Sequence, residues 1–184
     1  MVVLGIDPGS RRCGYGVVVR AGAGVSCLRS GVLAPGDLPL AERLARIFDG
    51  LSEILAESGP EAVAIETAYC GASARSALVL GQARGVALAA AARAGLPVFE
   101  YAPAEVKRAF TGSGRAEKAQ MVRTARTLFG RAPALADEAD ALAIAVCHLA
   151  HACAARSAPP ARRRGAAARG PVLRSSVRRF DEAP

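Results

Sequence analysis

Val2-Val3-Leu4-Gly5-Ile6-Asp7-Pro8-Gly9-Ser10 is the stretch that decides the fold: an apolar run that stops at an acidic residue and a turn. The run 2–6 is typical of a buried β-strand, and Pro8-Gly9 interrupts regular structure. Asp7 therefore stands where the strand breaks into the turn. A charge in that position is costly unless it is used, so Asp7 is predicted to be a functional residue at the end of the first strand.

The same layout occurs in a second segment, and a third acidic cluster opens a helix. The apolar run 62–65 leads into Glu66, and the cluster 137–140 precedes the apolar stretch 141–146. Two aspartates of that cluster are three residues apart, so on a helix they share one face. Carboxylate oxygens are natural ligands of hard divalent cations. The sequence predicts a metal site of four carboxylates: Asp7, Glu66, Asp137 and Asp140.

The alternative is that these acids are helix caps or solvated surface charges. That interpretation is reasonable for Glu138 and for Asp137 taken alone, but weak for Asp7 and Glu66, because both end apolar strands. Glu138 would compete as a ligand if the last helix were rotated. Glu138 and Asp140 are only two apart and cannot share a helix face, so the pair Asp137 and Asp140 is preferred.

Five strands and five helices are expected along the first 155 residues. Short glycine-containing connections join the first three strands as antiparallel hairpins, and the later strand–helix–strand order implies parallel pairing through a right-handed crossover. Asp37 is expected to cap the first helix, and Gly59-Pro60 to end it. The sequence thus predicts an α/β fold with a mixed five-stranded sheet flanked by helices. The strands are expected at 2–7, 14–20, 25–33, 62–66 and 97–101, and the helices at 39–58, 73–93, 103–110, 115–129 and 136–155.

The net charge of +8 is concentrated near the end of the sequence. Residues 155–184 hold 8 Arg and 2 acidic residues, a net +6, which leaves +2 for the rest of the 184 residues. From residue 156 the composition is rich in Arg, Ala and Pro, without periodicity, and this stretch is expected to be disordered. We therefore expect one folded domain, 1–155, followed by a tail, 156–184.

Nothing in the sequence predicts a membrane span or a secretory leader. The longest apolar candidate, 83–94, is interrupted by Arg84 and Arg93, and the first residues lack a basic leader and begin a strand. The 5 cysteines are odd in number and form no CxxC pair, which indicates free thiols in a reducing compartment. A cytoplasmic protein without a membrane partner is expected. The cluster Cys147-His148-x-x-His151-x-Cys153 raises zinc as a lesser alternative to core cysteines beside helix-end histidines.

Two lysines are unusual because the other 22 of the 24 basic residues are arginines. Lys107 and Lys118 flank the loop 111–114, and a compact ammonium on a flexible stem suits a single phosphate. Two solvated surface lysines are the alternative interpretation. Tyr69 follows Glu66 by three residues, which puts an aromatic ring beside the expected metal site.

Several segments, in this order, resemble the RuvC family of Holliday-junction resolvases: GIDPGS at 5–10, VAIETAY at 63–69, LGQARG at 80–85, the stretch 107–118 and ADEADALAIA at 136–145. The resemblance covers roughly residues 1–153, and the agreement of independent motifs makes it specific. It implies a ribonuclease H-like fold, with a nuclease domain at 1–155. It also implies catalytic and metal-binding roles for the four carboxylates, and DNA contacts from Tyr69, Lys107 and Lys118.

The resemblance further implies a structure-selective endonuclease that resolves four-way DNA junctions by paired symmetric nicks in recombination and DNA repair. Two Mg²⁺ ions per active site, which Mn²⁺ can replace, would serve phosphodiester hydrolysis. A homodimer would present two sites to a two-fold symmetric junction, and a branch-migration motor complex of the RuvA–RuvB type would supply junctions. Gly81 and Gly85 would allow close helix packing, either in the core or at the dimer interface. Ser73 stands where many relatives have Asn, which leaves the cleavage sequence preference open.

Three rival functions fit parts of the sequence. Another nuclease or a transposase-like enzyme of the same fold would usually carry an extra DNA-binding domain, which 184 residues do not accommodate. An actin-like sugar kinase or chaperone ATPase has a turn similar to GIDPGS but needs two such domains. A non-enzymatic DNA-binding protein would use its acids structurally, and nicking of a four-way junction with Mg²⁺ distinguishes it from the enzyme.

Overall fold

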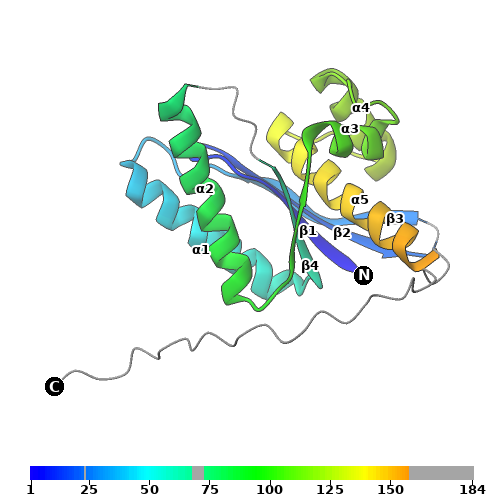
Figure 1. Cartoon of the computed structure of the whole chain (residues 1–184), viewed down its shortest axis with the longest axis horizontal. Helices are drawn as coiled ribbons and strands as arrows, with labels where there is room; N and C mark the ends of the chain where they lie inside the picture. The colour runs from blue at the N-terminus through cyan, green and yellow to red at the C-terminus, as the bar shows by residue number, and fades with distance from the viewer. Residues whose placement is uncertain (23, 68–72, 158–184) are drawn as a thin grey trace, which may run out of the picture.

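The computed structural model describes residues 1–22, 24–67 and 73–157, and in them five strands form one mixed sheet (Figure 1). The strand order across the sheet is β3-β2-β1-β4-β5. β1 pairs antiparallel with β2, and β2 with β3, whereas β4 runs parallel to both β1 and β5. The expected mixed five-stranded sheet is confirmed. The strands are β1 (Val2–Asp7), β2 (Cys13–Ala21), β3 (Gly24–Leu33), β4 (Ala62–Glu66) and β5 (Val98–Tyr101).

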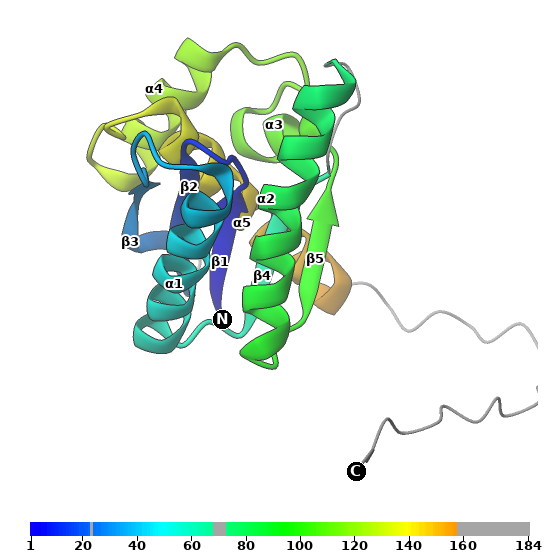
Figure 2. The same ribbon diagram turned by 90° about the vertical axis from the view of Figure 1, so that its left-hand side faces the viewer.

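Helices cover both faces of the sheet (Figure 1 and Figure 2). One face carries α1 (Leu40–Ser58) and α2 (Ala74–Arg93), and the other carries α3 (Pro103–Thr111), α4 (Lys118–Phe129) and α5 (Ala136–Ser157). Side chains of β1 alternate between the two layers: Leu4 and Ile6 pack in the α1–α2 core, and Val3 packs in the α5 core. Because β1 is buried on both faces, its sequence is apolar from Val2 to Ile6, up to the acidic residue at its end.

Glycines let the start of α5 approach the sheet more closely than other residues would. A Cβ at Gly5 of β1 would lie 2.1 Å from the carbonyl oxygen of Ala141. A Cβ at Gly14 of β2 would lie 2.0 Å from the carbonyl oxygen of Asp137. Both distances are far below van der Waals contact, so these strand positions require glycine. The first turns of α5 therefore lie directly on the ends of β1 and β2.

The expected helix boundaries are close to the observed ones, but the expected cap of α1 is wrong. Pro39 occupies the N-cap position without a side-chain cap, and Asp37 instead pairs with Arg11, with Nη1 and Oδ1 3.1 Å apart. The stop of α1 is confirmed, because Gly59 adopts the left-handed conformation, with φ of 52°, that favours glycine. α4 begins at Lys118, three residues after the expected start. α5 continues to Ser157, two residues into the expected tail, and the rest of that tail lies outside the described residues.

Two further expectations concern packing and membranes. A Cβ added at Gly81 or Gly85 would enter open space, so the core-packing interpretation of this glycine pair is wrong and the dimer interpretation stays a prediction. In the described part of the chain, no helix combines the length and apolar character needed to cross a bilayer.

Candidate active site

The carboxylates of Asp7 and Glu66 lie at the same edge of the sheet. Each is the last residue of its strand, and β1 and β4 are neighbours in parallel register, with Ile6 opposite Ile65. The carboxyl ends of parallel strands meet at one edge. Asp137 belongs to the turn of α5 that lies on Gly14, which itself pairs with Asp7. The structure thus brings the predicted residues of both strands and of α5 to one place.

The pKa values show that the four carboxylates share an electrostatic environment. Burial, together with the negative charges of Asp140, Glu66 and Asp137, raises the pKa of Asp7 to about 7. Burial and the charge of Asp140 raise the pKa of Glu66. Burial also raises the pKa of Asp140, and the neighbouring Asp137 adds to that effect. Like charges in a partly buried cluster destabilise one another, so the cluster favours binding a proton or a cation.

The donor set fits a hard divalent cation. All four predicted ligands offer carboxylate oxygens, which Mg²⁺ and Mn²⁺ prefer, and a cation would relieve the repulsion that raises the pKa of Asp7. Within the residues that the structure describes, no three acidic, histidine or cysteine side chains are already arranged to hold an ion.

Both predicted lysines lie beside the carboxylates. The positive charge of Lys118, the first residue of α4, opposes the rise in the pKa of Asp7 and of Asp140. The charge of Lys107 on α3 acts in the same direction on Glu66 and Asp140. The two ammonium groups reach the site from helices on the α5 side of the sheet. Tyr69 lies outside the described residues.

Glu138 is neither a surface charge nor a ligand of the cluster. Its side chain is only 2% exposed, so the interpretation as a solvated charge is wrong. One carboxylate oxygen accepts hydrogen bonds from Ser30 Oγ at 2.7 Å and Arg131 Nη2 at 2.8 Å, and the other accepts from the backbone N–H of Ala134 at 2.7 Å. Burial alone would raise the pKa of Glu138, but these hydrogen bonds outweigh it and hold the pKa below its ordinary value. Glu138 therefore anchors the start of α5 to β3.

A cavity of ≈ 180 Å³ opens beside the carboxylates, and Asp7, Glu66, Leu80 and Arg84 are among its lining residues. Arg84 is a site residue that reasoning about carboxylates and lysines missed, although it belongs to the LGQARG segment. Its Nη2 atom pairs with Glu100 Oε2 at 2.6 Å. Its Nη1 atom is buried and has no hydrogen-bond partner among the described residues. The guanidinium is thus fixed by β5 at the wall of the cavity.

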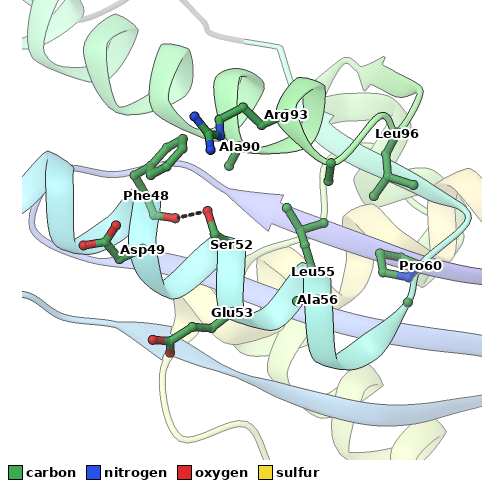
Figure 3. A pocket seen from close by; sticks show the side chains of 12 residues that line it. Phe48, Asp49, Ser52, Glu53, Leu55, Ala56, Pro60, Ala90, Arg93 and Leu96 are labelled. Atoms are coloured by element: carbon green, nitrogen blue, oxygen red, sulfur yellow. Dashed lines mark hydrogen bonds between the residues drawn. The ribbon is translucent and has the colours of Figure 1, made fainter.

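A larger cavity of ≈ 810 Å³ lies between α1 and α2, away from this chemistry (Figure 3). Phe48, Ser52 and Arg93 are among its lining residues, and the Arg93 guanidinium lies 5.9 Å from the centroid of the Phe48 ring. It contains none of the four predicted ligands. We assign the chemistry to the smaller cavity because titratable groups with raised pKa values converge there.

The zinc alternative at the end of α5 is not supported. His148 Nδ1 forms a hydrogen bond of 2.7 Å with the hydroxyl of Tyr101, and His151 Nε2 pairs with Glu105 Oε1 at 2.9 Å. Cys147 is buried in the core. The interpretation as core cysteines beside histidines is the better one.

Comparison with known proteins identifies the relatives of the chain. A family model described as Crossover junction endodeoxyribonuclease RuvC matches residues 3–148. The protein of that name from Anaeromyxobacter dehalogenans strain 2CP-C is 72% identical over 150 residues, which is 82% of this chain and 81% of the relative. The protein of that name from Chlorobaculum parvum is 49% identical over 152 residues, covering 81% of each chain.

Solved structures give the same result. Thermus thermophilus RuvC in complex with a Holliday junction substrate superposes with a TM-score of 0.78 and 39% identity, covering 84% of this chain and 96% of the other. The yeast mitochondrial Holliday junction resolvase Ydc2 superposes with a TM-score of 0.59 over 79% of this chain and 76% of the other, at 16% identity, and supports the fold alone.

Proposed function

Because the chain belongs to the RuvC family of crossover junction endodeoxyribonucleases, we propose that its carboxylate cluster cleaves four-way DNA junctions. The resemblance seen in the sequence motifs is thereby confirmed, as is the ribonuclease H-like α/β fold. The observation that carries the proposal is the convergence of Asp7, Glu66 and Asp140, with raised pKa values, beside two lysines. The reaction is hydrolysis of one phosphodiester bond in each of two opposed strands, as recombination and DNA repair require.

Family membership implies a nuclease that depends on divalent metal ions, and we assign two Mg²⁺ per site, with Mn²⁺ as a substitute. Asp7, which ends the central strand β1, would contact both ions. Glu66 would hold one ion, and Asp137 with Asp140 the other. When bound, such a pair activates a water and stabilises the leaving oxygen.

The residues of the chain prepare the site for that chemistry. The pKa of Asp7 is raised to about 7 in the metal-free protein, so Asp7 takes up a proton more readily than an ordinary aspartate, and a bound cation would favour its ionised form. The ammonium groups of Lys107 and Lys118 bind phosphate oxygens and hold the scissile strand against the carboxylates. Tyr69, which follows Glu66 by three residues, stacks on an unpaired base at the junction centre.

A homodimer supplies the second active site. A four-way junction has two-fold symmetry, and two identical subunits related by a two-fold axis offer two sites in the matching relation. We assign the interface to the outer face of α2, where Leu78 is 66% exposed and a Cβ at Gly81 or Gly85 would meet open space. An apolar side chain beside a glycine surface allows two helices to pack closely.

The remaining assignments follow from the same family membership. A branch-migration motor complex of the RuvA–RuvB type delivers junctions to the dimer in the cytoplasm, in keeping with the free thiols of Cys13 and Cys147. Residues 1–155 form the nuclease domain, and the arginine-rich tail, 156–184, adds electrostatic attraction for DNA.

Cleavage of a cruciform plasmid tests the proposal against its rivals. With Mg²⁺, the purified protein should linearise the plasmid at the base of the cruciform through paired nicks at symmetric positions. A non-enzymatic DNA-binding protein would retard the plasmid on a gel and leave it uncut. A nuclease of another specificity would nick relaxed plasmid equally well, and either result would exclude junction resolution.

A further inference from the structure

A second cavity, of ≈ 500 Å³, adjoins the carboxylate cavity and is lined by four arginines: Arg11, Arg12, Arg43 and Arg75. We call it the arginine cavity. Leu80 lines both cavities, and Pro8 of the carboxylate cavity is followed directly by Gly9 of the arginine cavity. The two cavities are therefore neighbouring parts of one surface that begins at Asp7.

Most of the positive charge in the arginine cavity has no acidic partner among the described residues. None of its lining residues is acidic. Arg11 pairs with Asp37, and both of these side chains are exposed. Among the described residues, Arg12, Arg43 and Arg75 have no carboxylate partner, whereas arginines elsewhere, such as Arg29 and Arg131, pair with glutamates. The cavity therefore carries an excess of positive charge, which attracts anions.

Arg43 gives a second indication of an absent anion. Its Nε atom is buried and has no hydrogen-bond partner within the described part of the chain. A buried donor without a hydrogen-bond partner destabilises a fold. An unpaired buried donor calls for an explanation, and a ligand in the arginine-lined cavity would supply one for Arg43.

Local backbone structure holds the arginines in place. The turn after β1 is so tight that a Cβ at Gly9 would lie 2.2 Å from the carbonyl oxygen of Arg12. Ser73 caps α2 by accepting a hydrogen bond of 3.3 Å from the backbone N–H of Ser76, and it places Arg75 in the first turn of that helix. The positive end of the helix dipole adds to the attraction for an anion.

We propose that the arginine cavity binds a backbone phosphate of the cut DNA strand, next to the phosphate held at the carboxylates. The proposal rests on the proposed function of the carboxylate site. Guanidinium groups form paired hydrogen bonds with phosphate oxygens, and several of them around one cavity hold a phosphodiester in a fixed position. Binding there would orient the strand so that its scissile phosphate reaches Asp7. The arginines are positioning residues and take no part in bond breaking.

Salt dependence of junction binding provides the first test. Two variants, Arg75→Gln and Arg43→Gln, each remove one positive charge from the arginine cavity. The control is Arg46→Gln, which removes the same charge from α1 at a residue that lines a different cavity. Each lost phosphate contact should reduce the slope of log affinity against log salt by about 0.9. We expect that reduction for Arg75→Gln and Arg43→Gln, and less than half of it for Arg46→Gln. Equal slopes for all three variants would overturn the proposal.

Single neutral phosphates locate the contact on the DNA. A set of junctions, each with one methylphosphonate at a different position around the cut site, is prepared. The affinity of each junction is measured for the wild-type protein and for the double variant Arg43→Gln/Arg75→Gln. We expect one position on the cut strand where the methylphosphonate weakens the binding of the wild-type protein by about tenfold. At that position it should not change the affinity of the double variant. If that position lies on an uncut strand, or if both proteins lose affinity equally, the assignment is wrong.

A DNA-free probe separates this proposal from the proposed function. Inorganic pyrophosphate, titrated into ¹⁵N-labelled wild-type protein, should shift the side-chain Nε–Hε signals of Arg43 and Arg75 but not that of Arg46. If the protein cut no junction while these signals still shifted, the proposed function would fall and the phosphate site would stand. Signals that do not move, together with unchanged salt slopes, would remove the phosphate site while leaving junction cleavage intact.

Discussion

Replacing Glu138 by alanine removes the acceptor of three hydrogen bonds that hold the start of α5 against β3. The donors are Ser30 Oγ, the backbone N–H of Ala134 and Arg131 Nη2, and Glu138 itself is only 2% exposed. The same turn of α5 carries the predicted ligands Asp137 and Asp140. The substitution therefore tests whether a buried carboxylate fixes the position of the active site.

The size of the effect follows from the exposure of each partner. Hydrogen bonds from Ser30 and Ala134 to a buried charge contribute about 1.5–3 kcal/mol each. Arg131 is 51% exposed, so its ion pair adds only about 0–1 kcal/mol because solvent screens it. With partial replacement of the lost contacts by water, we expect Glu138→Ala to lower the free energy of unfolding by about 3 kcal/mol. For a domain of this size that corresponds to a fall in Tm of about 6–12 °C.

Glu138→Gln gives a matched comparison because it keeps the shape and one acceptor oxygen. It should lower the free energy of unfolding by about 1–2 kcal/mol. The pKa of Glu138 is held below its ordinary value of 4.5, so the carboxylate stabilises the fold above that pH and loses this effect as the pH falls through the lowered pKa. The difference in stability between the wild-type protein and Glu138→Gln should therefore be constant above about pH 5.5 and shrink below pH 4.5.

Urea unfolding of metal-free protein, followed by circular dichroism at several pH values, measures these differences. Glu53→Ala, which removes an exposed carboxylate of α1, is the control and should change stability by no more than about 0.5 kcal/mol. Single-turnover cleavage at saturating enzyme should fall further for Glu138→Ala than for Glu138→Gln. If Glu138→Ala is as stable as the control at neutral pH, the hydrogen bonds of Glu138 do not hold α5.

Three further predictions concern the site and the tail. The pKa of Asp7 is raised from 3.8 to about 7 in the folded protein, so protonation of Asp7 stabilises the metal-free fold at low pH, and this effect is lost as the pH rises through 7. In urea unfolding with a chelator present, Asp7→Asn should therefore be more stable than the wild-type protein at pH 8 and equally stable near pH 4. Lys107→Ala and Lys118→Ala should each slow cleavage about tenfold or more at saturating enzyme, whereas full recovery at high enzyme concentration would show that the lysines only add affinity. Deleting residues 158–184 removes 7 Arg and 2 acidic residues, a net charge of +5. The deletion should weaken junction binding and reduce the slope of log affinity against log salt, without changing the single-turnover rate of cleavage. An unchanged slope would exclude a DNA contact by the tail.

Local patterns in the sequence predicted the parts of the site that depend on strand ends. Asp7 and Glu66 each follow an uninterrupted apolar run, so each could be predicted to end a strand, and the structure shows that these strands are parallel neighbours. The shared face of Asp137 and Asp140 follows from helix periodicity.

Contacts between distant segments could not be read from such patterns. Glu138 looked like a surface charge because its partner Ser30 lies 108 positions away. Asp37 is followed by a helix and has the chemistry of a cap, but it pairs with Arg11, which lies in the turn between β1 and β2. The arginine cavity is assembled from three separate segments, and no single one of them has an unusual density of charge.

Cleavage and binding of one synthetic four-way junction by the wild-type protein and by Asp7→Asn test the central claim most directly. With Mg²⁺, the wild-type protein should introduce two nicks at symmetric positions in opposed strands. Asp7→Asn should retard the junction on a gel with equal or slightly higher affinity, because one negative charge near the phosphates is removed, and should leave it uncut. Cleavage by Asp7→Asn at a rate near that of the wild-type protein would contradict the assignment of the carboxylate cluster as the active site.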